Sequence, residues 1–203
     1  MKFSQLSSFI GLAILTLPLG VLHEAVNPSL QYDPQAIRSG EIWRLLTAHI
    51  VHLSAIHAAL NLAALGLMMY GFGQSRSTPS LAFCALVSAL TISLSLFFWQ
   101  PQVSYYVGLS GVLHGLFLFM LLPLCSQKSV LAWAALALLV VKLVYEYWNQ
   151  VANAATEQLI GGPVLTVAHW YGAVSGMLAS GLWCSYRTLT RQCSATRKSD
   201  QSN

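Results

Sequence analysis

The chain has 203 residues, of which 56% are hydrophobic and only 8% are charged. Soluble domains carry about a quarter charged residues, so this composition excludes an ordinary soluble enzyme. The net charge of +4 comes largely from a basic tail, which membrane orientation and contact with anionic lipid explain without a nucleic-acid partner. The sequence therefore predicts an all-α membrane protein in contact with the lipid bilayer.

Six apolar segments have about the twenty residues that a helix needs to cross a bilayer. In chain order they are 7–22, 53–72, 81–99, 109–124, 130–147 and 164–186. We expect one six-helix membrane domain over residues 1–193, with short turns between helices, followed by a polar cytoplasmic tail over 194–203 that is disordered. The first segment also fits a cleaved signal peptide, although no small-x-small cleavage site precedes His23.

Charged residues orient the predicted bundle, because Lys and Arg near span ends stay on the cytoplasmic side. With both termini in the cytoplasm, seven basic residues lie on that side: Lys2, Arg76, Lys128, Arg187, Arg191, Arg197 and Lys198. Only Arg38 and Arg44 fall in an outer loop. The four cysteines lie in spans or in the cytoplasmic tail, so we expect no structural disulfide.

Polar side chains inside membrane spans are costly and therefore indicate function. Here they gather near the outer ends of four spans: His57 and Asn61 in the second, Ser110 and His114 in the fourth, Lys142 and Glu146 in the fifth, and His169 in the sixth. The second, fourth and sixth spans all run inward from the outer face. Their polar residues can therefore share one layer of the membrane although they lie far apart in sequence.

Ser110 and His169 form the minimum pair for nucleophilic catalysis, because a hydroxyl is a weak nucleophile until a base removes its proton. The oxyanion that forms next needs hydrogen-bond donors. His57 and Asn61 lie four residues apart on one helical face and can supply them, together with the backbone near Ser110.

Glycines on two spans explain how these groups could meet. Gly108, Gly111 and Gly115 flank Ser110, and Gly172 and Gly176 form a GxxxG face after His169. Small residues let transmembrane helices approach closely, so this pattern predicts contact between the fourth and sixth spans at the depth of Ser110.

These motifs resemble those of the rhomboid family of intramembrane serine proteases. The resemblance rests on Gly108-x-Ser110-Gly111-x-x-x-Gly115, on Ala168-His169-x-x-Gly172-x-x-x-Gly176, and on Trp43-Arg44 followed by His52, His57 and Asn61. It covers a core of about residues 43–187. It implies a six-helix rhomboid bundle in which Ser110 is the nucleophile, His169 is the general base, and His57 with Asn61 forms the oxyanion hole. It also implies no third catalytic carboxylate, no metal and no cofactor.

Within that family the chain is most similar to the rhombosortases, through the pair Lys142-x-x-x-Glu146 and the stretch from Ala168 to Gly176. This resemblance implies substrates that are exported proteins with a C-terminal anchor made of a Gly-Gly motif, a hydrophobic helix and a basic end. It also implies a bacterial inner membrane protein whose active site faces the periplasm.

Three residues keep more than one interpretation. Many rhomboids have an aromatic residue four positions after the serine, where this chain has His114, which could tune His169 or act as the base itself. Lys142 and Glu146 could form a structural ion pair on one helix or contact the substrate near its Gly-Gly motif.

Two other classes of protein fit parts of the pattern. A haem or metal protein could use His49, His52, His57, His114 and His169, although the sequence has no HExxH motif. A catalytically inactive rhomboid relative could bind transmembrane helices without cutting them. An intact Ser110 and His169 favour the protease.

Overall fold

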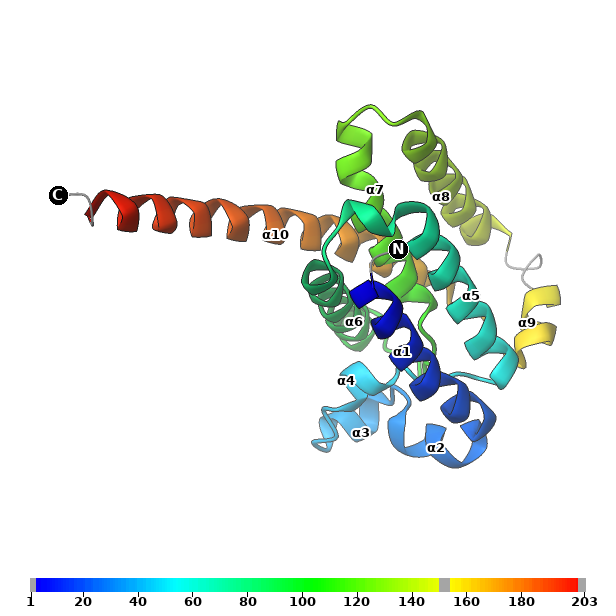
Figure 1. Ribbon diagram of the computed structural model, residues 1–203. Coiled ribbons are helices and arrows are strands. Elements are labelled where there is room, and N and C mark those ends of the chain that lie inside the picture. The colour runs from blue at the N-terminus through cyan, green and yellow to red at the C-terminus, as the bar shows by residue number, and fades with distance from the viewer. Residues whose placement is uncertain (1–2, 150–153, 201–203) are drawn as a thin grey trace.

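The computed structural model describes residues 3–149 and 154–200 and has the predicted all-helical fold (Figure 1). Among these residues the only extended pairing is an isolated bridge between Tyr32 and Tyr106. The α-helices are α1 (Phe3–Val21), α2 (His23–Leu30), α3 (Pro34–Arg38), α4 (Arg44–Thr47), α5 (Ala55–Phe72), α6 (Thr78–Trp99), α7 (Ser110–Ser126), α8 (Val130–Trp148), α9 (Ala154–Ile160) and α10 (Thr166–Asp200).

All six apolar segments predicted from the sequence are helical, as α1, α5, α6, α7, α8 and α10. Three stretches of the described chain are long and apolar enough to cross a membrane: Ala55–Ser75, Thr78–Trp99 and Val130–Trp148. A fourth is present if the bent pair of α1 and α2 counts as one span. Helix α7 is equally apolar but has only 17 residues, which suits a helix enclosed by the others.

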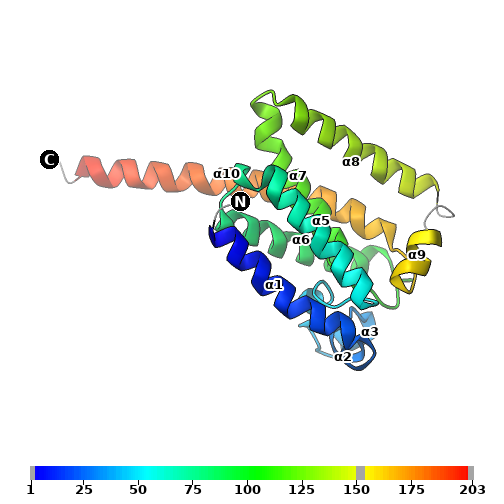
Figure 2. The same ribbon diagram turned by 45° about the vertical axis from the view of Figure 1, so that its right-hand side comes forward.

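Helix α7 is the centre of the bundle. Its residues are buried on nearly every side, as expected for a helix that is apolar all round. Its largest contacts are with α10, and it also packs against α5, α6 and α8. Figure 2 shows α1 running beside α5, with α8 on the far side of α7.

The predicted glycine contact joins α7 to α10. A Cβ built on Gly172 would overlap the Gly111 carbonyl, and one built on Gly176 would overlap the Gly115 carbonyl. The two backbones therefore touch without intervening side chains, as the GxxxG pattern predicted. This close contact carries His169, on the first turn of α10, to the start of α7.

The predicted outer loop is a compact segment with three short helices, α2, α3 and α4. Asp33 caps α3 through the backbone N–H groups of Gln35 and Ala36. The buried guanidinium of Arg44 bonds to Glu41 and donates to the carbonyls of Gln31 and Pro28, at 2.9 Å each. Arg44 therefore fixes the shape of this segment.

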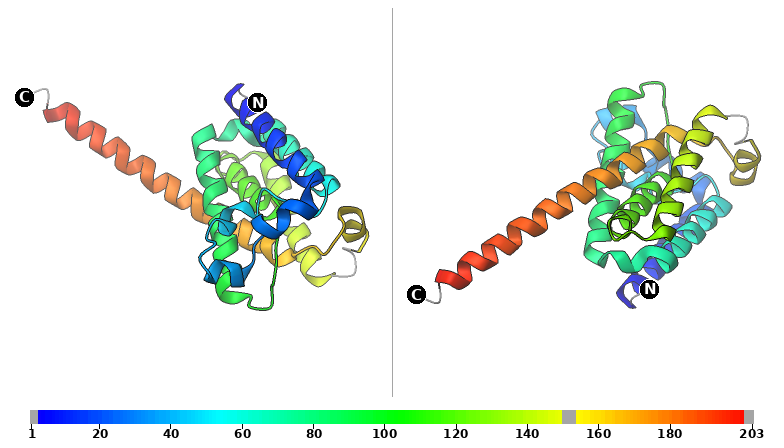
Figure 3. Two further views of the ribbon diagram at one scale, coloured as in Figure 1. Left: turned by 90° about the horizontal axis from the view of Figure 1, so that it is seen from below. Right: turned by 90° about the horizontal axis from the view of Figure 1, so that it is seen from above.

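The C-terminal end differs from the expected disordered tail, because α10 continues as one helix to Asp200 and projects from the bundle (Figure 3). The mainly polar residues after the apolar part of α10 extend the helix instead of ending it. Cys84, Cys125 and Cys184 have free thiols, in agreement with the expectation of no disulfide, and the side chain of Cys193 lies outside the described residues.

Candidate active site

The loop just before Ser110, residues 106–109, is held by backbone hydrogen bonds to two other parts of the chain. Tyr32 and Tyr106 exchange backbone hydrogen bonds of 3.0 and 3.3 Å, and the Gly108 N–H donates to the Ala48 carbonyl at 2.9 Å. The buried Tyr106 hydroxyl donates to the Gly108 carbonyl at 2.8 Å, and burial raises its pKa, so it stays protonated. Tyr32 and Ala48 thus hold the loop that leads to Ser110, the first residue of α7.

Ser110 and His169 lie within hydrogen-bonding distance, as the sequence pattern predicted. The distance between Ser110 Oγ and His169 Nε2 is 2.9 Å, although 59 residues separate the two in sequence. Both side chains come from the first turn of their helices, α7 and α10, which the glycine contact holds together. The arrangement has the geometry of a nucleophile and its general base.

A carboxylate completes this arrangement, which the family resemblance did not imply. Glu146, near the end of α8, accepts a hydrogen bond of 2.8 Å from His169 Nδ1. Its other oxygen binds the Lys142 ammonium at 2.6 Å, and 48% of the Lys142 side chain is exposed. The predicted ion pair between Lys142 and Glu146 is therefore present, and Glu146 also bonds to the histidine that faces Ser110.

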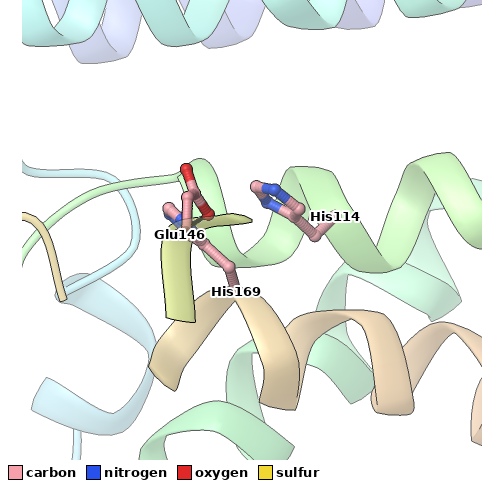
Figure 4. A group of neighbouring side chains, drawn as sticks. All are labelled: His114, Glu146 and His169. Carbon is pink, nitrogen blue, oxygen red and sulfur yellow. Dashed lines mark hydrogen bonds and ion pairs between the residues drawn. The ribbon is translucent and has the colours of Figure 1, made fainter. Parts of the chain in front are cut away.

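His114 lies against the same histidine, and Figure 4 shows His114, Glu146 and His169 converging from three helices. Lys142 can only donate, so His114 Nε2 accepts a hydrogen bond of 3.1 Å from its ammonium group. The His114 proton is then on Nδ1 and is donated to the Ser110 carbonyl at 2.7 Å. Both ring nitrogens of His114 are occupied, and neither bonds to the Ser110 hydroxyl. This arrangement disfavours His114 as the base.

His57 and Asn61 line the same cavity as Ser110. The Leu53 N–H donates to His57 Nδ1 at 3.3 Å, which places the His57 proton on Nε2. The Asn61 side-chain amide donates to the His57 carbonyl at 3.1 Å and has a second N–H. Gly108 brings the backbone close to the His57 ring at a φ of +123°. Both predicted oxyanion residues thus have a donor at the edge of the cavity.

The cavity itself has a volume of about 680 Å³ and a mostly apolar wall. It is lined by residues of α5, α7, α8 and α9, by His169 of α10, and by the loops 102–107 and 163–165. Ser110 and His169 are among its polar lining residues. An extended peptide with apolar side chains would fit such a site.

A model of the Rhomboid domain matches residues 39–186, which is most of the chain. The protein belongs to the rhomboid family. Rhomboid proteins are multi-pass membrane proteins of an intramembrane protease family, in agreement with the apolar helices and with the contact between Ser110 and His169. No individually curated protein gives a significant match to the chain.

Two further histidines of this rhomboid protein lie outside the Ser110 cavity. His49 Nε2 lies 3.0 Å from the Ala89 carbonyl and from Ser93 Oγ, and burial lowers its pKa to about 4. His52 is fully buried with its ring edge-on to His57, and burial lowers its pKa to about 3. Both rings are therefore buried and neutral.

The set of possible metal ligands is smaller than the five histidines considered from the sequence. Among the described residues, His114, Glu146 and His169 have ligand atoms within 4.8 Å of one another. The Lys142 ammonium bonds two of these three side chains, so it already supplies a positive charge at this point. The three side chains and Lys142 form a hydrogen-bonded network around His169.

The sequence did not reveal the hydrogen bond between His169 and Glu146. Glu146 lies four residues after Lys142, and that spacing is fully explained by an ion pair on one helix surface. The signal that could have found the contact is position, because Glu146 lies near the end of one predicted span and His169 near the start of the next.

Proposed function

We propose that this rhomboid protein is an intramembrane serine endopeptidase that cuts exported proteins near the outer end of a C-terminal membrane anchor. The observation that carries the proposal is the 2.9 Å contact between Ser110 Oγ and His169 Nε2 beside a mostly apolar cavity. The family match to residues 39–186 supports the same class of reaction.

In the first half of the reaction, Ser110 Oγ attacks the peptide carbonyl carbon while its proton moves to His169 Nε2. The carbonyl oxygen becomes an oxyanion. The free N–H groups of His57 and Asn61 and the backbone N–H groups in the first turn of α7 are suited to stabilise it. When the C–N bond breaks, His169 returns the proton to the leaving amine and an acyl ester remains on Ser110.

In the second half, His169 takes a proton from a water molecule, which attacks the ester. When the bond between the acyl carbon and Ser110 Oγ breaks, His169 returns the proton to Ser110 Oγ, and the new C-terminus is released. An amine could attack instead of water and become joined to that C-terminus. The two outcomes need the same residues, and they differ in the mass of the product by the attached amine.

The substrate class follows from the resemblance to rhombosortases and from the shape of the site. A Gly-Gly motif has no side chains and can adopt an extended conformation, so its backbone can come close to Ser110 and His57. The hydrophobic helix that follows would remain in the bilayer, and its basic end would stay in the cytoplasm. We place the protein in a bacterial inner membrane, with both termini in the cytoplasm and the active site facing the periplasm.

The proposal is tested by producing the protein together with an exported substrate that has a Gly-Gly motif, a hydrophobic helix and a basic end. The C-terminal mass of the released product is compared for wild type, Ser110→Ala and His169→Ala. A matched control is Ser126→Ala, at the opposite end of α7, where the hydroxyl bonds only to the Pro123 carbonyl among the contacts described.

Wild type and Ser126→Ala should release the product, and the Ser110 and His169 variants should lose at least about 10³-fold in rate. Full processing by Ser110→Ala would overturn the mechanism. A second substrate with Leu-Leu in place of Gly-Gly tests the specificity, because equal processing of both substrates would remove the Gly-Gly requirement.

A further inference from the structure

His169 makes a second hydrogen bond that determines whether it can work as a base. A neutral imidazole has one N–H and one free nitrogen, so the partner of one nitrogen sets the state of the other. His169 Nε2 lies 2.9 Å from Ser110 Oγ, and His169 Nδ1 lies 2.8 Å from Glu146 Oε2. A carboxylate only accepts, so Glu146 holds the proton on Nδ1 and leaves Nε2 free to accept from Ser110.

We infer that Glu146 is the third member of a Ser110–His169–Glu146 triad, and that Lys142 and His114 hold its carboxylate in place. This inference rests on the proposed protease function. Glu146 acts through His169 and does not touch the scissile bond, so it is a positioning residue. This role differs from substrate contact, the other function that the positions of Lys142 and Glu146 allow.

The Glu146 carboxylate belongs to a closed ring of hydrogen bonds. The other members of the ring are Lys142, His114, Ser110 and His169. Lys142 donates to Glu146 Oε1 at 2.6 Å and to His114 Nε2 at 3.1 Å, and His114 Nδ1 donates to the Ser110 carbonyl at 2.7 Å. Each carboxylate oxygen therefore has one partner, Lys142 or His169. A single negative charge in this partly buried place is costly, and the ammonium balances it.

The ring makes a specific prediction about the amide variant. In Glu146→Gln, one end of the side chain can only accept and the other can only donate. The Lys142 ammonium attracts the oxygen and repels the NH₂ group, so the NH₂ group turns toward His169. His169 must then accept at Nδ1 and carry its proton on Nε2. In this tautomer it cannot take the proton of Ser110.

Removal of Lys142 releases that constraint. In the double variant with Glu146→Gln and Lys142→Met, the amide oxygen is free to face His169 Nδ1 and restore the productive tautomer. Lys142→Met alone leaves Glu146 facing His169 and should lower kcat by only about tenfold. The second substitution should therefore increase the activity of the first variant, a result that a purely structural role of Glu146 does not produce.

The experiment measures kcat and KM of the purified full-length protein in bilayers with a transmembrane substrate, and its labelling by a fluorophosphonate that reacts with activated serines. We expect Glu146→Gln to lower kcat by about 10²–10⁴-fold with KM changed by less than about threefold. The double variant should recover at least about tenfold. Tyr147→Phe, an exposed change on the same helix, is the matched control with wild-type activity.

Two outcomes overturn the triad: Glu146→Gln with near wild-type kcat, or a double variant no faster than Glu146→Gln. Loss of labelling in Ser110→Ala checks the proposed nucleophile separately, so failure of the protease function is recognised independently. If Glu146→Gln does not fold, ¹⁵N-histidine spectra of the wild-type protein provide the test, because they show which ring nitrogen of His169 carries the proton. The His169→Ala variant identifies the His169 signal. His169 protonated at Nε2 and not at Nδ1 would contradict the inference.

Discussion

The imidazole rings of His114 and His169 lie face to face, with their centroids 4.2 Å apart and their planes inclined by 16°. This contact gives His114 the packing role of an aromatic residue at a position where many rhomboids have one. Its two nitrogens are bonded to Lys142 and to the Ser110 carbonyl.

His114→Phe keeps the flat ring but loses both hydrogen bonds. We expect kcat to fall by about tenfold, because Glu146 still holds His169 in the productive tautomer. His169→Ala should lose at least about 10³-fold. Rates of substrate cleavage for the two variants provide the comparison. Equal losses in both would show that His114 takes part in the proton transfer.

Gly172 sets the distance between α7 and α10, so a methyl group there should separate the helices. A Cβ at this position overlaps the Gly111 carbonyl, which belongs to the backbone and cannot move aside. We expect Gly172→Ala to destabilise the protein by about 1–3 kcal/mol and to lower activity further by displacing His169. Thermal melting in detergent measures the first effect.

The matched control for Gly172 is on the same helix. A Cβ at Gly181 meets no atom within 4 Å, so Gly181→Ala removes a glycine without creating a clash. It should be neutral or stabilising by up to about 1 kcal/mol, because alanine favours the helix. Equal destabilisation by both substitutions would contradict the close contact.

Gly108 controls the space in front of the proposed oxyanion donor. A Cβ there lies 2.9 Å from His57 Cε1, and the φ of +123° is unfavourable for other residues. Gly108→Ala should therefore lower kcat by about 10²-fold by displacing His57. Gly40→Ala has a similar φ of +105° in open space, so it shows the effect of backbone strain alone. Similar losses in both would remove the role of His57.

The Lys142 ammonium lies between side chains that could bind a metal ion. Lys142→Met removes this charge and leaves His114, Glu146 and His169 with ligand atoms within 4.8 Å of one another. We expect this variant to bind Zn²⁺ and its residual activity to be at least about tenfold more sensitive to Zn²⁺ than wild type. A chelator should restore that activity. Further substitution of His114 by Phe should abolish the zinc sensitivity.

His49 should make the fold sensitive to acid. Burial lowers its pKa to about 4, whereas an exposed histidine titrates near 6.5. Below pH 6.5 the unfolded state binds a proton that the folded state does not, so stability falls as the pH decreases from 6.5 to 4. The full effect is about 3 kcal/mol. His49→Gln does not titrate, so its melting temperature should depend less steeply on pH over this interval.

The sequence indicated the parts of the site that depend on contacts between whole helices. The glycines around Ser110 and after His169 predict a close approach of two spans, and the hydropathy pattern orients both helices in the same direction. These two facts alone bring Ser110 and His169 to one depth. Their distance of 2.9 Å is consistent with that prediction.

The sequence did not indicate the partner of Glu146. A lysine and a glutamate four residues apart are satisfied by each other, so the pattern contains no sign of a third partner. The second bond depends on the rotation of α8 about its own axis, which is set by packing against α7 and α10. Hydropathy also did not predict the short helices α2, α3 and α4, because their stability comes from single contacts such as those of Arg44.

The bridge between Tyr32 and Tyr106 connects the region matched by the family model, which starts at residue 39, to a residue that precedes it. Tyr32 lies before that boundary, yet its backbone holds the loop that presents Ser110. A chain trimmed to the matched region would keep all residues of the proposed triad and lose one of the supports that keep them in register. The proposed activity therefore depends also on a segment that contributes no side chain to the proposed triad.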